Sequence, residues 1–283
     1  MAVDSFKEKM TSLGYVEGQN IIYDINSDNA NYSAEKEVAS KFLSEKVDLI
    51  VVMPTEASIS MKHSINGSIP IVFTHAFTEG VDLIDSISHP GINITGVKWK
   101  SVDIASKGLE IMHELIPAAK RFYVPYDSTY PSVPATLAVL RPTAERLNLT
   151  LVEAPVKTVK ELEDDINARY ERNDSGVDAI ISVSNALTAS PEARNLIKDF
   201  SEKFRLPSIS STANTSVFTY SPDAAEGGVD AAILADKILR GTPAGSIPVM
   251  SLENKLVIYY KNVQNLGINI SQELLARADD IIR

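Results

Sequence analysis

The sequence predicts a doubly wound α/β protein, because short β-branched segments alternate with longer amphipathic segments along its 283 residues. Two of the short segments, residues 48–53 and 178–183, are nearly continuous apolar runs. Such runs are typical of parallel strands that are covered on both faces. At about 150 residues per domain, the length predicts two globular units.

Each predicted strand is a short run rich in aliphatic, β-branched or aromatic residues. In chain order, the strands are expected at residues 21–25, 48–53, 69–73, 94–97, 121–126, 149–153, 178–183, 207–209 and 256–260. The amphipathic stretches predict helices at residues 5–13, 34–45, 56–64, 103–115, 133–147, 159–173, 191–203, 224–239 and 272–282. Two helix ends carry specific signals: Ser190 precedes Pro191 as an N-cap, and Gly241 follows Arg240 as a left-handed stop.

The composition argues against several classes of protein. Lysine and arginine number 27 against 37 acidic residues, a net charge of −10 that disfavours binding to nucleic acids or anionic membranes. No apolar run approaches the roughly 18 residues of a membrane helix, and the first ten residues carry no apolar signal-peptide core. The chain has no cysteine, which excludes disulfides, thiolate nucleophiles and iron–sulfur clusters.

Catalytic and metal-binding motifs are missing as well. The four histidines show neither i, i+4 spacing nor an HExxH frame, and no GxSxG elbow, P-loop or strand-linked GxGxxG occurs. We therefore expect no enzyme activity, no cofactor and no metal. The acidic pairs Asp164–Asp165 and Asp279–Asp280 are interpreted as solvated helix faces, not as catalytic carboxylate dyads.

Polar residues that directly follow predicted strands are the best candidates for a ligand site, since ligands of open α/β sheets bind at the carboxyl ends of the strands. After the strand at 48–53, Thr55 and Ser58 offer hydroxyls for a ligand, although Thr55 equally suits a helix cap. After the strand at 69–73, His75 is either a structural residue or a ligand contact.

Further candidates follow the strands at 121–126 and 178–183. They include Ser128 and Asn185. Asp127 is the best partner for a ligand ammonium, since a carboxylate in a partly dry site needs a cation. An Asx turn that starts the next helix explains Asp127 equally well.

Several segments resemble a known family. They are residues 14–21 (GYVEGQNI), 89–97 (HPGINITGV) and above all 265–283 (NLGINISQELLARADDIIR), which carry the patterns PGxNxTG and LGIxIxxxLLxxAD. From about Asp4 to Arg283 the chain is similar to ABC-transporter substrate-binding proteins of the TrpX-like group, the tryptophan and phenylalanine binders with the type I periplasmic-binding-protein fold.

The resemblance implies two Rossmann-like lobes with parallel sheets, joined by three crossings, with a ligand cleft between the lobes. We expect residues 1–98 and 214–245 in lobe 1, and residues 99–213 and 246–283 in lobe 2. In relatives, a strand precedes the helix that matches Val3 to Leu13, so the first strand of lobe 1 is missing here. Either the start is trimmed or misplaced, or lobe 1 does without this central strand, which would expose both neighbouring strand edges. We expect a trimmed or misplaced start, and therefore reduced stability of lobe 1.

The implied function is that of an extracytoplasmic solute receptor of an ABC importer, which captures a small molecule by cleft closure. It would be a periplasmic or extracellular, membrane-associated and monomeric protein whose partner is an ABC permease, with the signal or lipoprotein segment absent from this chain. The expected ligand is an amino acid with an aromatic or apolar side chain. The alternative is a ligand-sensing domain of the same fold, in a signalling or regulatory system.

The family's binding loops fall on the residues Thr55, Ser58, Thr74, His75, Ala76, Phe77, Tyr126, Asp127, Ser128, Asn185, Thr212 and Tyr220. Hydroxyls and backbone N–H groups near Thr55 and Ser58 would hold the ligand carboxylate, and Asp127 would face its ammonium. The ligand side chain would lie among aromatic residues, namely Phe77, Tyr126 and Tyr220. Two departures from the family bear on ligand identity: residues 74–77 read Thr-His-Ala-Phe in place of a Thr-Asp-Pro type turn, and the loop at 213–220 is shorter than in the tryptophan binders.

Overall fold

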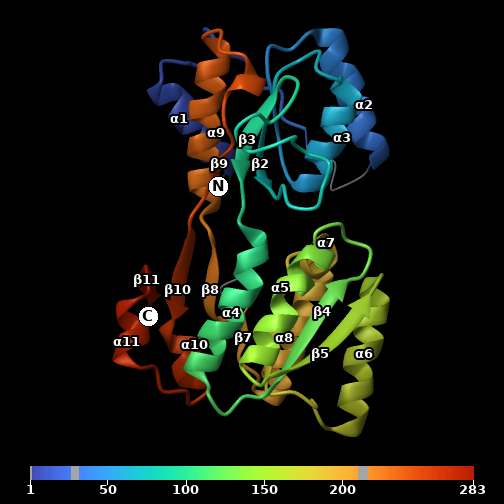
Figure 1. The fold of residues 1–283 in the computed structure, drawn as a ribbon, viewed down its shortest axis with the longest axis vertical. Coiled ribbons are helices and arrows are strands. Elements are labelled where there is room, and N and C mark those ends of the chain that lie inside the picture. The colour runs from blue at the N-terminus through green and yellow to red at the C-terminus, as the bar shows by residue number, and fades with distance from the viewer. Residues whose placement is uncertain (1, 27–31, 210–215) are drawn as a thin grey trace. The chain divides into compact units, whose positions relative to one another are not determined.

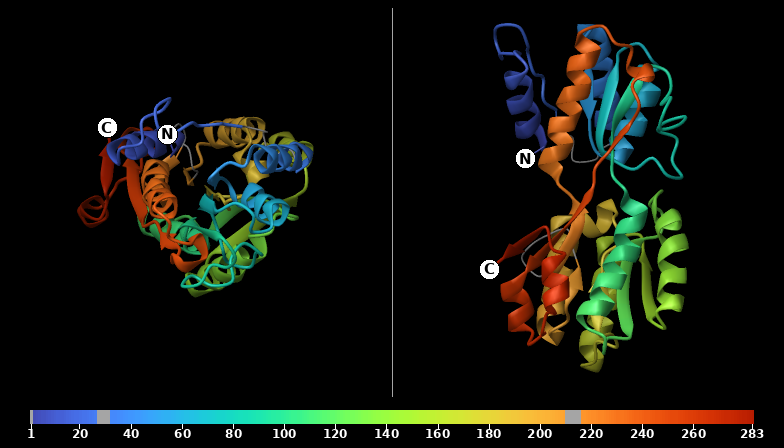
Figure 2. Two further views of the ribbon diagram at one scale, coloured as in Figure 1. Left: turned by 90° about the horizontal axis from the view of Figure 1, so that it is seen from above. Right: turned by 60° about the vertical axis from the view of Figure 1, so that its left-hand side comes forward.

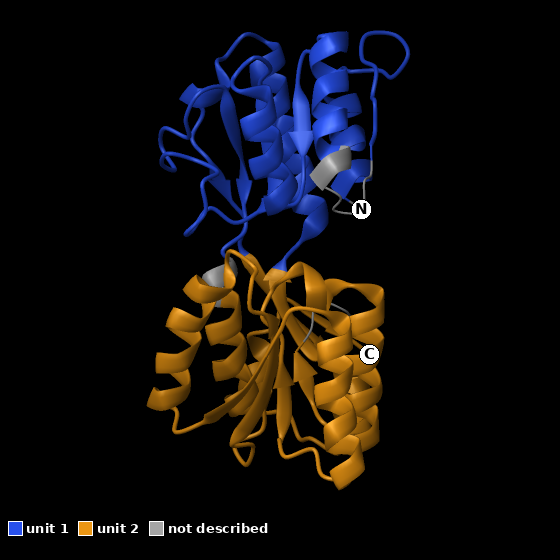
Figure 3. Cartoon of the chain, turned by 90° about the vertical axis from the view of Figure 1, so that its right-hand side faces the viewer, with its two compact units in different colours: residues 1–100, 222–253 blue, residues 101–221, 254–283 orange. Residues whose placement is uncertain are grey.

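The chain forms two compact units (Figure 3), and the computed structural model describes residues 2–26, 32–209 and 216–283. Unit 1 comprises residues 1–100 and 222–253, and unit 2 comprises residues 101–221 and 254–283. The first crossing lies two residues from the predicted position. The second and third follow Ser221 and Glu253, later than predicted. The sequence did not predict the strands just before these crossings, β8 (Ser216–Pro222) and β9 (Met250–Ser251).

Unit 1 is built on a parallel sheet. Its strand order is β1-β2-β3-β9, in which β1 is Ile50–Val52, β2 is Ile71–Ala76 and β3 is Ile94–Lys98. Ile71 of β2 is in register with Ile50 on one side and Ile94 on the other. These strands follow the predicted apolar runs, because buried aliphatic side chains are needed on both faces of the sheet.

Helices cover both faces of this sheet (Figure 1). On one face lie α1 (Ala2–Ser12) and α9 (Ala224–Leu239), which run side by side in Figure 2. On the other lie α2 (Tyr32–Glu45) and α3 (Thr55–Ile65). The two helices α1 and α9 pack very closely, since a Cβ on Gly228 would lie 2.1 Å from the Ala2 carbonyl oxygen. A short 3₁₀ helix, η1 (Ala244–Ser246), precedes β9.

A cavity of about 1690 Å³ lies in unit 1 beside β1. Apolar side chains of α1, α2 and β1 line it, together with residues 20–26. The strand predicted at residues 21–25 is wrong: this segment forms only an isolated bridge between Glu17 and Ile21. It runs along the cavity without a neighbouring strand to pair with, and β1 is the edge strand of the sheet in the described part of the chain.

Unit 2 contains the larger sheet, with the strand order β11-β10-β8-β7-β6-β4-β5. Its further strands are β4 (Arg121–Asp127), β5 (Thr150–Val156), β6 (Ala179–Ile181), β7 (Ser208–Ile209), β10 (Asn254–Tyr259) and β11 (Asp280–Ile282). The helices are α4 (Ser101–Leu115), α5 (Val133–Arg146), α6 (Val159–Arg172), α7 (Ala186–Ala189), α8 (Pro191–Phe204), α10 (Tyr260–Asn265) and α11 (Gln272–Ala276). The fold class predicted from the sequence, two α/β units with parallel sheets, is confirmed.

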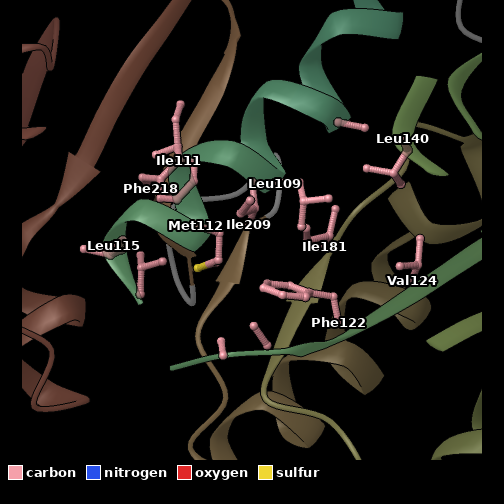
Figure 4. Close-up of a cluster of buried hydrophobic side chains, with 14 of the residues drawn as sticks. Leu109, Ile111, Met112, Leu115, Phe122, Val124, Leu140, Ile181, Ile209 and Phe218 are labelled. Atoms are coloured by element: carbon pink, nitrogen blue, oxygen red, sulfur yellow. The ribbon is translucent and has the colours of Figure 1, made fainter. Parts of the chain in front are cut away.

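Two apolar clusters form the core of unit 2. One, shown in Figure 4, packs Leu109 and Met112 of α4 against Phe122 of β4. The other surrounds Tyr123 and Phe200, whose rings meet edge to face with centroids 5.5 Å apart. Phe122 and Tyr123 are both fully buried although they point to opposite faces, as a central parallel strand requires.

The acidic pair Asp164–Asp165 is only partly a solvated helix face. Asp164 is exposed, as expected for a solvated helix face, and it pairs with the exposed Lys160. Asp165 instead accepts a hydrogen bond of 2.7 Å from Tyr123 Oη and one of 3.0 Å from Arg169 Nε. Arg169 is buried, and it also donates to the Ser175 carbonyl and lies over the Tyr123 ring. Asp165 therefore closes a polar network at the edge of the core.

The chain end also departs from the prediction. The helix expected at residues 272–282 stops at Ala276, and β11 then pairs in parallel with β10. Asp279 accepts a hydrogen bond from Leu256 N (2.7 Å), so it fixes the start of this pairing and is not a solvated helix residue. Both predicted helix signals are confirmed: Ser190 Oγ caps α8 by accepting from Ala193 N, and Gly241 has a φ of 100°. Across the described ranges, we find no helix with the length and apolar character needed to cross a bilayer.

Candidate functional site

The carboxyl ends of β1, β2 and β3 form the polar rim of unit 1. Thr55 begins α3 directly after β1 and is 2% exposed. Its Oγ1 accepts a hydrogen bond of 3.1 Å from Phe77 N, which follows β2, so the two strand ends are tied together. The N-cap of α3 is Pro54, with no side-chain cap, and Thr55 is therefore not the capping residue. Ser58 is fully buried, and its hydroxyl donates to the Pro54 carbonyl at 2.6 Å.

His75 occupies an unusual position at the end of β2. Its φ is +54°, and the pairing of β2 with β3 is irregular between Phe73 and Ala76. Left-handed backbone in a residue with a side chain is costly, and it is common at functional sites. Its ring lies 3.2 Å from Thr74 Oγ1 and packs on the indole of Trp99, with centroids 5.0 Å apart. Burial lowers the pKa of His75, which keeps the imidazole neutral at neutral pH.

The neighbours of His75 are buried within unit 1. Thr74 is 1% exposed, and its hydroxyl donates to the Gly227 carbonyl of α9 at 3.2 Å. Ala76 and Phe77 are buried as well. The structure thus brings Thr55, Thr74, His75 and Phe77 to one edge of the sheet, as predicted from the strand ends.

In unit 2, Tyr126 and Asp127 end β4. Tyr126 Oη donates to Glu153 at 2.7 Å, and Glu153 accepts two bonds of 2.8 Å from Arg141. The Arg141 guanidinium lowers the pKa of Glu153, while burial and the carboxylate of Glu153 raise the pKa of Tyr126. Tyr126 is therefore held in a fixed orientation by a charged pair that the sequence did not reveal.

One oxygen of the Asp127 carboxylate already accepts hydrogen bonds within the protein. Its Oδ1 accepts from Thr129 N at 2.8 Å and from Thr129 Oγ1 at 2.6 Å, which is the Asx turn expected as one alternative. The backbone N–H of Ser128 donates to the Val156 carbonyl at 2.9 Å. The Asx turn fixes the direction of Asp127 and uses one of its two oxygens.

The other predicted residues of unit 2 have mixed surroundings. Asn185 follows β6, the neighbour of β4 in the sheet, so it lies at the same edge as Tyr126 and Asp127. Its Oδ1 accepts from Thr188 N at 2.9 Å and its Nδ2 donates to the Val183 carbonyl at 2.8 Å, which makes it the N-cap of α7. Tyr220 lies in β8 and packs partly on the core. Thr212 lies outside the described residues.

Two residues of the unit 1 rim were missed by the sequence analysis. Both carboxylate oxygens of Glu56 and the Nε1 of Trp99 are buried without a hydrogen-bond partner. Trp99 follows β3 in the same way that Thr55 follows β1, so the strand-end argument would have found it. No group of three or more acidic or histidine side chains in the described ranges is placed to hold a metal ion.

Comparison with known proteins gives a family match over nearly the whole chain. The family model for "ABC transporter substrate binding protein" matches residues 1–282. A tyrosine-binding protein of Clostridioides difficile (strain R20291) is 26% identical over 264 residues, which cover 91% of this chain and 73% of that protein.

Solved structures show the same fold. A conserved domain protein from Vibrio cholerae superposes with a TM-score of 0.84 at 24% identity, covering 99% of this chain and 95% of that one. An ABC domain from Streptococcus pneumoniae in complex with L-Trp gives a TM-score of 0.83 at 20% identity, with the same coverage. At these identities the likeness concerns the fold alone, and it agrees with the two α/β units described above.

Proposed function

Because the chain belongs to the family of ABC transporter substrate binding proteins, we propose that it binds a free amino acid with an aromatic or apolar side chain. The observation that carries the proposal is the family match over residues 1–282. The name of the tyrosine-binding relative and the L-Trp complex of the Streptococcus pneumoniae protein support this class of ligand.

In unit 1, we assign the ligand carboxylate to the neighbourhood of Thr55. The Thr55 oxygen accepts from Phe77 N, which leaves its O–H to donate, and the first N–H groups of α3 have no side-chain cap. Hydroxyl and helix N-terminal N–H donors suit an anion. Ser58 then has a supporting role, since its hydroxyl is held by the Pro54 carbonyl. Thr74, His75, Ala76 and Phe77 form the adjoining wall.

In unit 2, we assign the ligand ammonium to Asp127. The Asx turn orients this carboxylate through Oδ1, and Oδ2 is the oxygen that would meet the ammonium. Tyr126, whose hydroxyl is anchored on Glu153, would offer its ring to the ligand side chain, together with Phe77 and Tyr220. We also assign three polar residues to the part of the ligand site in unit 2, namely Ser128, Asn185 and Thr212.

Isothermal titration calorimetry of the purified chain with L-tyrosine, L-tryptophan, L-phenylalanine and L-leucine tests the proposal. We expect at least one of them to bind more tightly than about 100 µM, which corresponds to about −5.5 kcal/mol. Weaker binding of all four would contradict it. Asp127→Asn should weaken the binding of the best ligand by about 2 kcal/mol, the scale for truncating a buried charge pair. Unchanged affinity would remove Asp127 from the site.

The remaining parts of the proposal concern the setting of this receptor. Proteins of this family act outside the cytoplasm. We propose that this one works as a membrane-associated monomer in the periplasmic or extracellular space and delivers its ligand to an ABC permease. We further propose that it releases the ligand chemically unchanged, so incubation with the bound amino acid should yield no product by mass spectrometry.

A further inference from the structure

Trp99 carries a buried hydrogen-bond donor without an acceptor. The residue follows β3 at the carboxyl edge of the unit 1 sheet, and its Nε1 is buried with no partner. An indole N–H can only donate, and a buried donor that makes no hydrogen bond carries the full cost of its desolvation. A ligand oxygen at this position would relieve that cost.

Glu56, the other unpartnered polar side chain of this rim, has a structural explanation that Trp99 lacks. Glu56 lies in the first turn of α3, where the partial positive charge of the helix N-terminus favours a carboxylate. Trp99 belongs to no helix, and its neutral indole gains nothing comparable. Its donor therefore points more directly to a bound partner.

The position of Trp99 is fixed by the same peptide group that fixes Thr55. Trp99 N donates to the Ala76 carbonyl at 2.9 Å, and the N–H of the same peptide, that of Phe77, donates to Thr55 Oγ1 at 3.1 Å. One peptide group thus separates the backbone of Trp99 from the residue assigned to the ligand carboxylate. The two residues therefore share the carboxyl edge of the unit 1 sheet.

The indole itself is held in place. It packs on the His75 ring at a centroid distance of 5.0 Å. The His75 ring in turn lies close to α9, because a Cβ on Gly227 would be 3.2 Å from His75 Cε1. The lysines on either side of Trp99 are already engaged: Lys98 pairs with Glu79, and Lys100 pairs with Glu253 at 2.6 Å. The indole N–H is thus a rigid, neutral donor in this segment.

We propose that Trp99 is a ligand-contacting residue whose indole N–H donates a hydrogen bond to the carboxylate of the bound amino acid. The inference rests on the proposed function and adds a specificity determinant to it. A ligand that lacks the carboxylate leaves this donor unpaired and is discriminated against.

The chain offers a direct test, since Trp99 is its only tryptophan. Excitation at the red edge of the indole absorption reports this residue alone. We expect titration with the tightest binder among L-tyrosine, L-phenylalanine and L-leucine to shift or quench the emission of the wild-type protein, with the same dissociation constant as in calorimetry. Emission that stays unchanged at calorimetric saturation would overturn the proposal.

A substitution separates the hydrogen bond from the packing. Trp99→Phe keeps an aromatic ring against His75 and removes the N–H, and it should weaken binding of the same amino acid about tenfold, or about 1.4 kcal/mol. The same substitution should change the affinity for the decarboxylated amine of that amino acid by less than about twofold, because this ligand has no carboxylate to accept the hydrogen bond. Tyr15→Phe is the matched control: it removes a donor of unit 1 that is bound to Asp236, and affinity should not change.

The outcomes distinguish this inference from the proposed function. Equal losses for the amino acid and its amine would assign Trp99 a packing role, and no loss for either would place it away from the ligand. Both results overturn the inference while the wild-type protein still binds amino acids. Absence of wild-type binding to every amino acid tested would overturn the proposed function and, with it, this inference. Circular dichroism establishes that Trp99→Phe is folded, and the wild-type fluorescence titration does not depend on the variant.

Discussion

Neighbouring acidic residues on α6 allow a sharp test of the polar network at Tyr123. Asp165 accepts hydrogen bonds from Tyr123 and Arg169, whose side chain is 9% exposed, whereas Asp164 pairs only with the exposed Lys160. We therefore predict that Asp165→Ala destabilises unit 2 strongly and that Asp164→Ala does not. Both variants truncate an aspartate to alanine, and the two positions are adjacent in the same helix.

The magnitudes follow from the burial of the partners. Removing one member of a buried ion pair costs about 3–5 kcal/mol. Because the Asp165 side chain is itself 36% exposed, water compensates in part, and we expect the lower end, about 3 kcal/mol. Tyr123→Phe removes one hydrogen bond to a charged group and should cost about 1.5 kcal/mol. The Asp164→Ala variant should stay within about 0.5 kcal/mol of the wild type.

A double-variant cycle completes the test. Once Asp165 is gone, the Tyr123 hydroxyl has no acceptor, so the combined variant should cost about the same as Asp165→Ala alone, a coupling of about 1.5 kcal/mol. Urea titrations followed by far-UV circular dichroism give the free energies of unfolding, and hydrogen exchange of the β4 amides assigns the change to unit 2. A cost of Asp165→Ala no greater than that of Asp164→Ala, or simple addition of the Asp165→Ala and Tyr123→Phe effects, would show that Asp165 does not anchor this network.

Three further predictions concern stability. Burial and the neighbouring Asp165 raise the pKa of Tyr123, so the contribution of this hydroxyl to stability is complete below about pH 10, the pKa of an unfolded tyrosine, and is lost as the pH rises further. The urea midpoint of the wild type should therefore fall above that pH, and it should fall less steeply in Tyr123→Phe. The same pH dependence in both proteins would contradict the role of Tyr123. Gly228→Ala should destabilise unit 1 by about 1 kcal/mol, because the clash with the Ala2 carbonyl should cost about 2 kcal/mol and the gain in helix propensity is about 1 kcal/mol. Hydrogen exchange of the α9 amides measures this change, and a gain in stability would be the opposing result. The amides of β1 should exchange faster than those of β4, since β1 borders the cavity on one side; equal protection would show that this edge is not a weak point.

Much of the fold followed from local sequence signals. The buried strands β1, β2, β4 and β6 were predicted because their aliphatic runs suit only a sheet covered on both faces. The helix stop at Gly241 and the cap at Ser190 were predicted because backbone conformation and hydrogen bonding at these positions are local. The strand-end argument likewise grouped Thr55 with His75, and Tyr126 with Asn185, because parallel strands expose their carboxyl ends at one edge.

Pairing partners decided what local signals could not. Residues 280–282 form a strand because β10 lies beside them, and residues 21–25 do not because their neighbour is a cavity. Asp164 and Asp165 are alike in sequence, and only the fold places one against Tyr123 and the other in solvent. The same holds for the unpartnered indole N–H of Trp99, a property of its surroundings and not of its residue type. Hydrophobic periodicity and local conformational preference thus depend only on residues that are close together in the sequence. Burial, pairing and hydrogen-bond satisfaction depend on segments far apart in the chain, and they exist only once the tertiary structure brings those segments together.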